Sequence, residues 1–95
     1  MQGIDLKLLR AFVKLVEKGN YSVGAKSLFV TQPTLTKQIQ ALETLTDGQL
    51  FLRGRHGATL TSFGSQLFVK AKSILQSHDN FLSYAKQLNQ SEQQI

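Results

Sequence analysis

The chain has 95 residues, and its 11 lysines and arginines against six acidic residues give a net charge of +5. That length predicts one small domain, and the basic balance favours a polyanionic partner such as nucleic acid or an anionic surface. The sequence has no cysteine, its two histidines lack a metal-ligand pattern, and its apolar runs are too short to span a bilayer. The start, MQGIDLKLL, lacks the features of a secretory signal. We therefore expect a soluble cytoplasmic protein with no metal, no cofactor and no membrane partner.

A first helix is predicted over Leu6–Lys18. Asp5 is a candidate N-cap for this helix. Gly19 and Asn20 follow as a stop, since Gly readily adopts the left-handed conformation that closes helices. The apolar residues recur on one side, at Leu6, Leu9, Phe12, Val13 and Val16. This helix is therefore expected to supply core.

The segment 21–42 predicts a short helix, a tight turn and a second helix. Ser22 is a candidate N-cap for the short helix, and Thr31 is one for the second helix. Phe29 and Val30 place apolar bulk in the turn, so the turn is expected to pack inward.

The second helix of this segment has two different faces. Leu35, Ile39 and Leu42 form an apolar stripe with the helical period, which predicts burial. The opposite face carries hydroxyls, amides and one cation but no carboxylate, at Gln32, Pro33, Thr36, Lys37, Gln40 and Thr44. Such side chains suit base edges and phosphates in a DNA groove. A polar helix surface that contacts only water has the same residue types, so this pattern alone leaves both interpretations open.

Two short strands are predicted at 49–52 and 58–60. The Gly-rich turn between them contains Arg53 and Arg55, so the pair would form a wing. Arginine suits a narrow minor groove, where the negative potential is enhanced. The alternative is a hairpin tip whose arginines serve only solubility.

A long helix is predicted to begin at Thr61 or Ser62 and to end near Leu88, leaving 89–95 as a frayed tail. Seven positions recur at alternating spacings of four and three: Leu67, Ala71, Ile74, His78, Phe81, Ala85 and Leu88. This is the 3.5-residue period of paired helices, so we expect these residues to form a dimer interface. A second stripe could pack on the preceding domain or widen the interface, at Phe63, Phe68, Leu75 and Leu82.

Over roughly 6–88 the chain resembles LysR-type transcriptional regulators. Its helix-turn-helix run has that family's residues and spacing, at Ala25, Leu28, Val30, Thr31, Gln32, Pro33, Leu35, Thr36, Ile39, Leu42 and Glu43. The match continues at Leu50, Phe51, Arg53, Leu60, Thr61 and Gly64. The resemblance implies a mainly α fold: a winged helix-turn-helix of three helices and a two-stranded wing at 1–61, then a linker helix at 62–88.

The sequence departs from the family pattern just after this run. The family usually has Leu and Gly at the positions that are Thr46 and Asp47 here. We expect Leu45 and Gly48 to take over as apolar anchor and helix stop.

The resemblance also implies sequence-specific binding to double-stranded DNA by a homodimer, on an interrupted inverted repeat. It assigns base contacts to Gln32, Pro33, Thr36, Lys37 and Gln40. It assigns phosphate contacts to Ser22, Thr31 and Thr34, and minor-groove contacts to Arg53 and Arg55. Full-length members of the family are often tetramers and bind effectors through a further domain, so no small-molecule effector site is expected in this segment.

Other classes of function fit the residues less completely. The molybdate-responsive regulators have a similar winged domain, and a helical adaptor module would use the polar face of the second helix to bind protein. Salt separates these classes, because DNA binding weakens steeply as salt rises whereas an apolar helix interface does not. No catalytic residues are expected, because the chain has neither a nucleophile–base arrangement nor a phosphate-cradling loop.

Overall fold

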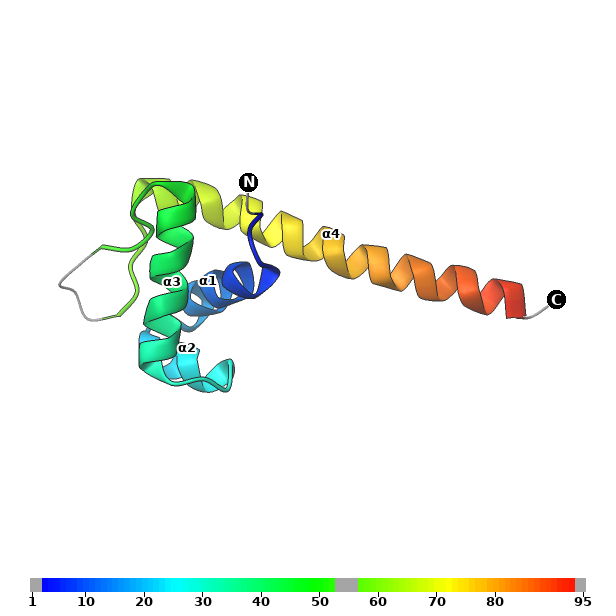
Figure 1. The fold of residues 1–95 in the computed structure, drawn as a ribbon, viewed down its shortest axis with the longest axis horizontal. Helices are drawn as coiled ribbons and strands as arrows, with labels where there is room; N and C mark the ends of the chain where they lie inside the picture. Colours follow the sequence, from blue (N-terminus) through cyan, green and yellow to red (C-terminus); the bar gives the residue numbers. More distant parts are fainter. Residues whose placement is uncertain (1–2, 53–56, 94–95) are drawn as a thin grey trace.

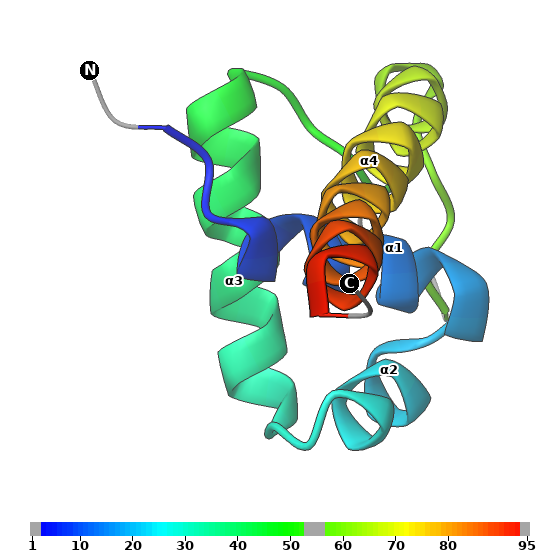
Figure 2. The same ribbon diagram turned by 90° about the vertical axis from the view of Figure 1, so that its right-hand side faces the viewer.

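The computed structural model describes residues 3–52 and 57–93. These residues form the helices α1 (Leu6–Lys18), α2 (Tyr21–Ser27), α3 (Gln32–Thr46) and α4 (Ser62–Gln93). The first three helices and the start of α4 make one body, from which the rest of α4 extends (Figure 1). The extents of 60 × 29 × 22 Å reflect this projecting helix. Viewed along α4, α3 stands beside it and α2 lies at the N-terminal end of α3 (Figure 2).

The core lies where α1, α3 and the start of α4 meet. Its largest fully buried side chains come from α1, α3 and the segment after α3: Phe12, Leu15, Leu35, Leu42 and Leu50. The Phe12 ring meets Phe51 and Phe68 edge to face, with centroid separations of 5.8 and 6.2 Å. Each such side chain contributes roughly 1.5–3 kcal/mol by leaving water. The burial predicted for Leu35, Ile39 and Leu42 is confirmed.

The helix starts follow local hydrogen bonding. Asp5 accepts a hydrogen bond from the Lys7 backbone N–H at 2.9 Å, as predicted. At α2 the cap is Asn20, whose side-chain oxygen accepts from the Val23 backbone N–H at 2.7 Å. Ser22 already lies in the first turn of α2, so its prediction as the cap was wrong. Thr31 caps α3 as predicted, accepting from the Thr34 backbone N–H at 3.3 Å.

The turn between α2 and α3 has one residue facing in and one facing out. The Val30 N–H donates to the Ala25 carbonyl at 3.0 Å, and the Phe29 N–H donates to the Lys26 carbonyl at 3.1 Å. This pair of bonds closes a helix with a left-handed residue, and here that residue is Phe29 with φ 59°. Val30 packs on the core, but Phe29 is 95% exposed, so the prediction that Phe29 packs inward was wrong.

The end of α3 also differs from the prediction. The stop is Asp47, which adopts the left-handed conformation with φ 61°. Leu45 is exposed, whereas Thr46 is half-buried and donates its hydroxyl to the Leu42 carbonyl at 2.8 Å. Leu45 is therefore not the apolar anchor, and Gly48 is not the stop. Gly48 instead packs closely on the start of α4, since a Cβ there would come within 2.5 Å of the Phe63 ring.

The wing is reduced to a single bridge within the described residues. Phe51 and Leu60 form an antiparallel bridge, and the Leu52 N–H donates to the Thr59 carbonyl at 2.8 Å. No further ladder is formed by the described parts of 49–52 and 58–60, so the two predicted strands are not observed as strands. The predicted wing arginines, Arg53 and Arg55, lie outside the described residues.

α4 begins where predicted and is longer than predicted. Thr61 is its cap, because the Thr61 hydroxyl accepts from the Gly64 backbone N–H at 2.9 Å. The helix continues to Gln93, past the predicted end at Leu88, so 89–93 are helical. Within the described residues, no helix combines the length and apolarity needed to cross a membrane.

The seven α4 positions predicted to form the dimer interface, here called the seam, fall into two groups. Ala71 is 3% exposed and Leu67 is half-buried, and both pack on the core of their own chain. Ala71, which was predicted at the dimer interface, is thus already buried in its own chain, where α4 packs on α1. Farther along α4, Ile74, Phe81 and Leu88 are exposed at 48, 71 and 49%.

Candidate nucleic-acid interface

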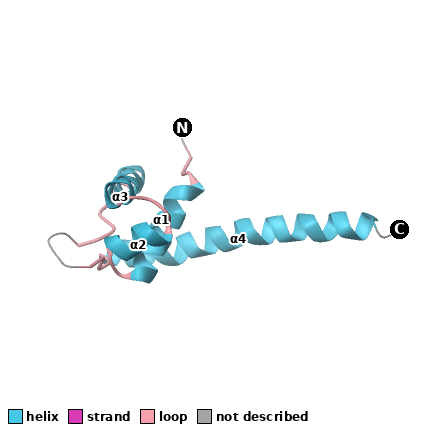
Figure 3. Ribbon diagram, turned by 90° about the horizontal axis from the view of Figure 1, so that it is seen from below, coloured by secondary structure: helices cyan, strands magenta, loops and turns pink. Residues whose placement is uncertain are grey.

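Close packing of α2 sets the position of α3. Gly24 and Ala25 are buried between the helices, and an added Cβ on Gly24 would meet Leu15 and Leu35 side-chain atoms at 3.4 Å. The small residues therefore let α2 approach both α1 and α3. With Leu35 and its stripe held in the core, the opposite face of α3 is turned outward. Figure 3 shows α3 at the end of the molecule away from the C-terminus of α4.

The structure brings the six side chains opposite the apolar stripe of α3 onto one exposed surface, the reading surface. All six are exposed along the outer side of α3: Gln32, Pro33, Thr36, Lys37, Gln40 and Thr44. Lys37 is the cation of this surface, and hydroxyls and amides surround it. The Thr44 hydroxyl donates to the Gln40 carbonyl at 3.0 Å, so its hydrogen is used inside the helix. Thr44 can therefore offer an outside partner only an acceptor.

The start of α3 holds two of the three predicted phosphate ligands. The Thr31 hydroxyl donates to the Thr34 hydroxyl oxygen at 3.0 Å while it caps the helix. Thr31 has thus used its own hydrogen, which leaves the Thr34 hydroxyl as the outward donor of the pair. Ser22 is exposed on the first turn of α2. Thr31 and Thr34 lie at the N-terminal end of α3, where the helix dipole favours anions.

A shallow hollow of about 470 Å³ adjoins the other end of the reading surface. It is lined by Gln40, Glu43 and Thr44 of α3 and by Asp47, Gly48 and Gln49, which follow the helix. The sequence analysis missed Gln49 as a neighbour of this surface. Periodicity finds residues that share one helix, but no periodic signal connects a helix to the segment after its end.

Two carboxylates lie beside the reading surface. The Glu43 carboxylate accepts a hydrogen bond from the Leu50 backbone N–H at 2.8 Å and is half-buried. Asp47 is exposed and, with Glu43, lines the hollow next to Gln40 and Thr44. The six positions of the reading surface themselves include Lys37 and no carboxylate, which suits a negatively charged partner.

The family model described as "Bacterial regulatory helix-turn-helix protein, lysR family" matches residues 6–65. The chain belongs to the LysR family. This LysR-family chain is 40% identical over 74 residues to the uncharacterized HTH-type transcriptional regulator YdcI of Escherichia coli (strain K12), covering 78% of this chain and 24% of YdcI. It is 38% identical over 72 residues to the nitrogen assimilation regulatory protein nac of Klebsiella aerogenes, covering 76% of this chain and 24% of the relative. The chain thus spans about a quarter of the length of these relatives.

Solved structures of the family share the fold. A structure titled "Crystal Structure of BenM_DBD/catB site 1 DNA Complex" superposes with a TM-score of 0.89 at 31% identity, covering 94% of this chain and 96% of that chain. A second, titled "Crystal structure of CbnR_DBD-DNA complex", superposes with a TM-score of 0.83 at 31% identity, covering 87% and 95%. The LysR-family chain therefore has the winged helix-turn-helix fold, including its linker helix.

Proposed function

We propose that the chain is the DNA-binding domain of a bacterial transcriptional regulator. The observation that carries this proposal is the outer side of α3, which is exposed, polar, cationic and free of carboxylate over its predicted reading positions. The similarity to structures titled as DNA complexes supports the same conclusion. A role on the chromosome would place the protein in the cytoplasm, and it assigns the chain no catalytic residue, cofactor or metal.

In this proposal α3 enters the major groove. Gln32, Thr36 and Lys37 read base edges, Pro33 contacts thymine methyl groups, and Gln40 lies at the margin. Lysine lacks the planar fork that binds guanine at two points, so Lys37 should discriminate less than arginine would. Ser22, Thr31 and Thr34 hold phosphates, and Arg53 and Arg55 of the wing enter the minor groove.

A homodimer would place two copies of α3 on the two halves of an inverted repeat. The part of α4 beyond the body supports this arrangement, because it exposes apolar side chains that its own chain does not cover. The interface we propose consists of Ile74, His78, Phe81, Ala85 and Leu88. Leu67 and Ala71 support the same helix from within the body.

Selection of bound sequences from a random double-stranded DNA pool tests the proposal. We expect the enriched sequences to share an interrupted inverted repeat, and we expect the affinity for it to fall steeply between 50 and 200 mM salt, by roughly 10³-fold or more if several phosphates are contacted. An adaptor that binds protein through α3 would enrich no sequence. Its affinity for DNA would also be low at every salt concentration, and that result would contradict the proposal.

A further inference from the structure

Phe29 is the most unusual residue on the surface of the body. Its ring is 95% exposed, and its backbone has φ 59°, a conformation that bulky L residues rarely adopt. A glycine or asparagine would fit this left-handed position with less strain. No residue in the described part of the chain covers the Phe29 ring. A strained and exposed residue of this kind points to a function outside the chain.

A hollow of about 400 Å³ lies directly beside this turn. The neighbours of Phe29 in sequence, Leu28 and Val30, contribute apolar surface to it. Lys7 and Arg10 of α1 contribute positive charge, and Thr34 of α3 contributes a hydroxyl. The described residues that line this hollow include no carboxylate. Apolar side chains and two cations thus line a hollow beside the turn that carries Phe29.

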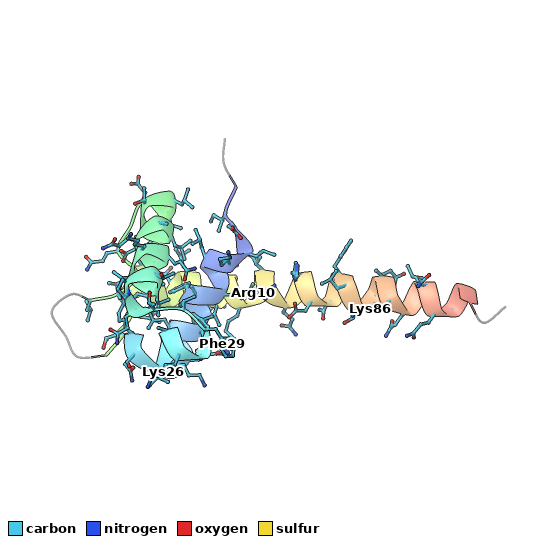
Figure 4. The ribbon with its side chains drawn as sticks, turned by 60° about the horizontal axis from the view of Figure 1, so that its bottom comes forward. Arg10, Lys26, Phe29 and Lys86 are labelled. Atoms are coloured by element: carbon cyan, nitrogen blue, oxygen red, sulfur yellow. The ribbon has the colours of Figure 1, made fainter. Side chains whose placement is uncertain are left out.

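The charged side chains of α1 and α2 near Phe29 are positive. Lys26, in the last turn of α2, is exposed, and within the described residues no carboxylate pairs with Lys7, Arg10 or Lys26. Figure 4 labels Phe29, Lys26 and Arg10 on the same side of the body. A partner that covers Phe29 must therefore meet positive charge, and complementary potential selects a negatively charged one.

We propose that Phe29 and this hollow bind an acidic segment of a partner protein. An exposed aromatic side chain beside arginine is the typical anchor of a protein interface, where it is buried against an apolar residue of the partner. The carboxylates of the segment pair with Lys7 and Arg10. The surface lies on the flank of α3 toward α1, whereas Lys37 and Gln40 lie on the outer side. Thr34 belongs both to this hollow and to the proposed phosphate contacts. This inference goes beyond DNA binding and does not require it.

A library of random peptides displayed on phage, panned against the 95-residue chain, provides the probe. We expect the enriched peptides to be rich in Asp and Glu around one bulky apolar residue. A labelled enriched peptide is then titrated with the chain by fluorescence anisotropy. Phe29→Asn should weaken binding about tenfold or more, because Asn accepts the left-handed backbone but removes the ring.

Lys7→Glu is the second variant, since Arg10 also contacts His78 Nδ1 at 3.5 Å and is less suitable for substitution. It too should weaken peptide binding. Val69→Asn is the matched control, because Val69 is 65% exposed on α4 and does not line the hollow, and it should leave the affinity unchanged. The same variants are titrated with operator DNA, for which Phe29→Asn should match the wild type.

Three results would overturn the proposal. The panning enriches no peptide, or enriches peptides without an acidic excess. The enriched peptides bind Phe29→Asn and Lys7→Glu as tightly as the wild type. Phe29→Asn weakens operator binding by the same factor as peptide binding, which would make the surface part of the DNA interface. The first two results are obtained without DNA, so the two proposals fail separately.

Discussion

The Glu43 carboxylate accepts a hydrogen bond from the Leu50 backbone N–H, with 2.8 Å between Oε2 and the amide nitrogen. Leu50 is fully buried, and its carbonyl accepts from the Thr61 N–H at 3.0 Å. Leu50 therefore donates to Glu43 near the end of α3 and accepts from Thr61 at the start of α4. The bond from Glu43 fixes the wing segment relative to the reading helix, and the bond from Thr61 fixes it relative to α4.

Removing the Glu43 acceptor should destabilise the fold. Hydrogen bonds to charged groups contribute about 1.5–3 kcal/mol, and Glu43→Ala leaves the Leu50 N–H unsatisfied, so we expect the free energy of unfolding to fall by about that amount. Glu43→Gln retains an oxygen acceptor and should lose less. Urea denaturation measures both, with Glu17→Ala as the exposed control, for which a change within about 0.5 kcal/mol is expected. If Glu43→Ala were as stable as the wild type, the Glu43–Leu50 hydrogen bond would not stabilise the fold.

Much of this architecture follows from periodicity and caps in the sequence. The stripe of Leu35, Ile39 and Leu42 determines which side of α3 is buried, and therefore which side faces outward. Asp5 and Thr31 act as predicted because a cap depends on only three or four neighbouring residues. The prediction of Ser22 as a cap failed because Asn20, two residues earlier, offers an equally good acceptor.

The errors in the candidate site come from interactions that a linear pattern does not contain. Phe29 and Asp47 adopt left-handed conformations that glycine would signal, so both turns were predicted but not the residues that close the two helices. The heptad positions of α4 continue through the body, where Leu67 and Ala71 have the spacing of a dimer seam but pack on their own core. Periodicity identifies the buried side of a helix without identifying what covers it.

The two left-handed residues allow a test by stabilisation. Phe29→Gly and Asp47→Gly should each raise the free energy of unfolding by about 0.5–1 kcal/mol. The relief of left-handed strain exceeds the added entropy of glycine in the unfolded chain. Val23→Gly has the opposite expectation, a loss of about 1 kcal/mol, because Val23 is an exposed residue inside α2. Thermal and urea unfolding of the three variants should therefore change in opposite directions. Destabilisation by both Phe29→Gly and Asp47→Gly would show that their conformations are not strained.

Two glycines should respond differently to alanine. A Cβ on Gly64 would overlap the Leu50 carbonyl oxygen, whereas a Cβ on Gly48 would meet the Phe63 ring. A backbone carbonyl tied to Thr61 cannot move easily, but the exposed Phe63 side chain can swing aside. We expect Gly64→Ala to lose about 1–3 kcal/mol of stability and Gly48→Ala to lose clearly less. Gly3→Ala is the control, since no atom lies within 4 Å of its added Cβ. The reverse order of the two losses would contradict this account.

Base reading by α3 should depend on which side of the helix is changed. Gln32→Ala and Thr36→Ala should each weaken binding to the selected operator by roughly 1–3 kcal/mol while leaving the affinity for random DNA similar. Gln38→Ala is the matched control, because Gln38 is an amide on the same helix that faces the hollow beside α1. Electrophoretic mobility shifts with both DNAs measure the ratio of the affinity for the operator to the affinity for random DNA. Equal losses on operator and random DNA would refute base reading at these positions.

Pairing through the exposed part of α4 is tested by adding charge to it. Phe81→Asp and Leu88→Asp should convert a dimer into monomers, because a buried unpaired carboxylate is strongly unfavourable in an interface. The monomers should remain folded, because both side chains are exposed in the single chain. Ser83→Asp adds the same charge at an exposed position outside the seam and should leave the dimer intact. Leu67→Asp should instead unfold the domain, because Leu67 packs on the core of its own chain. Light scattering gives the mass and circular dichroism the helix content of each variant. A dimer that survives both Phe81→Asp and Leu88→Asp would place the interface elsewhere.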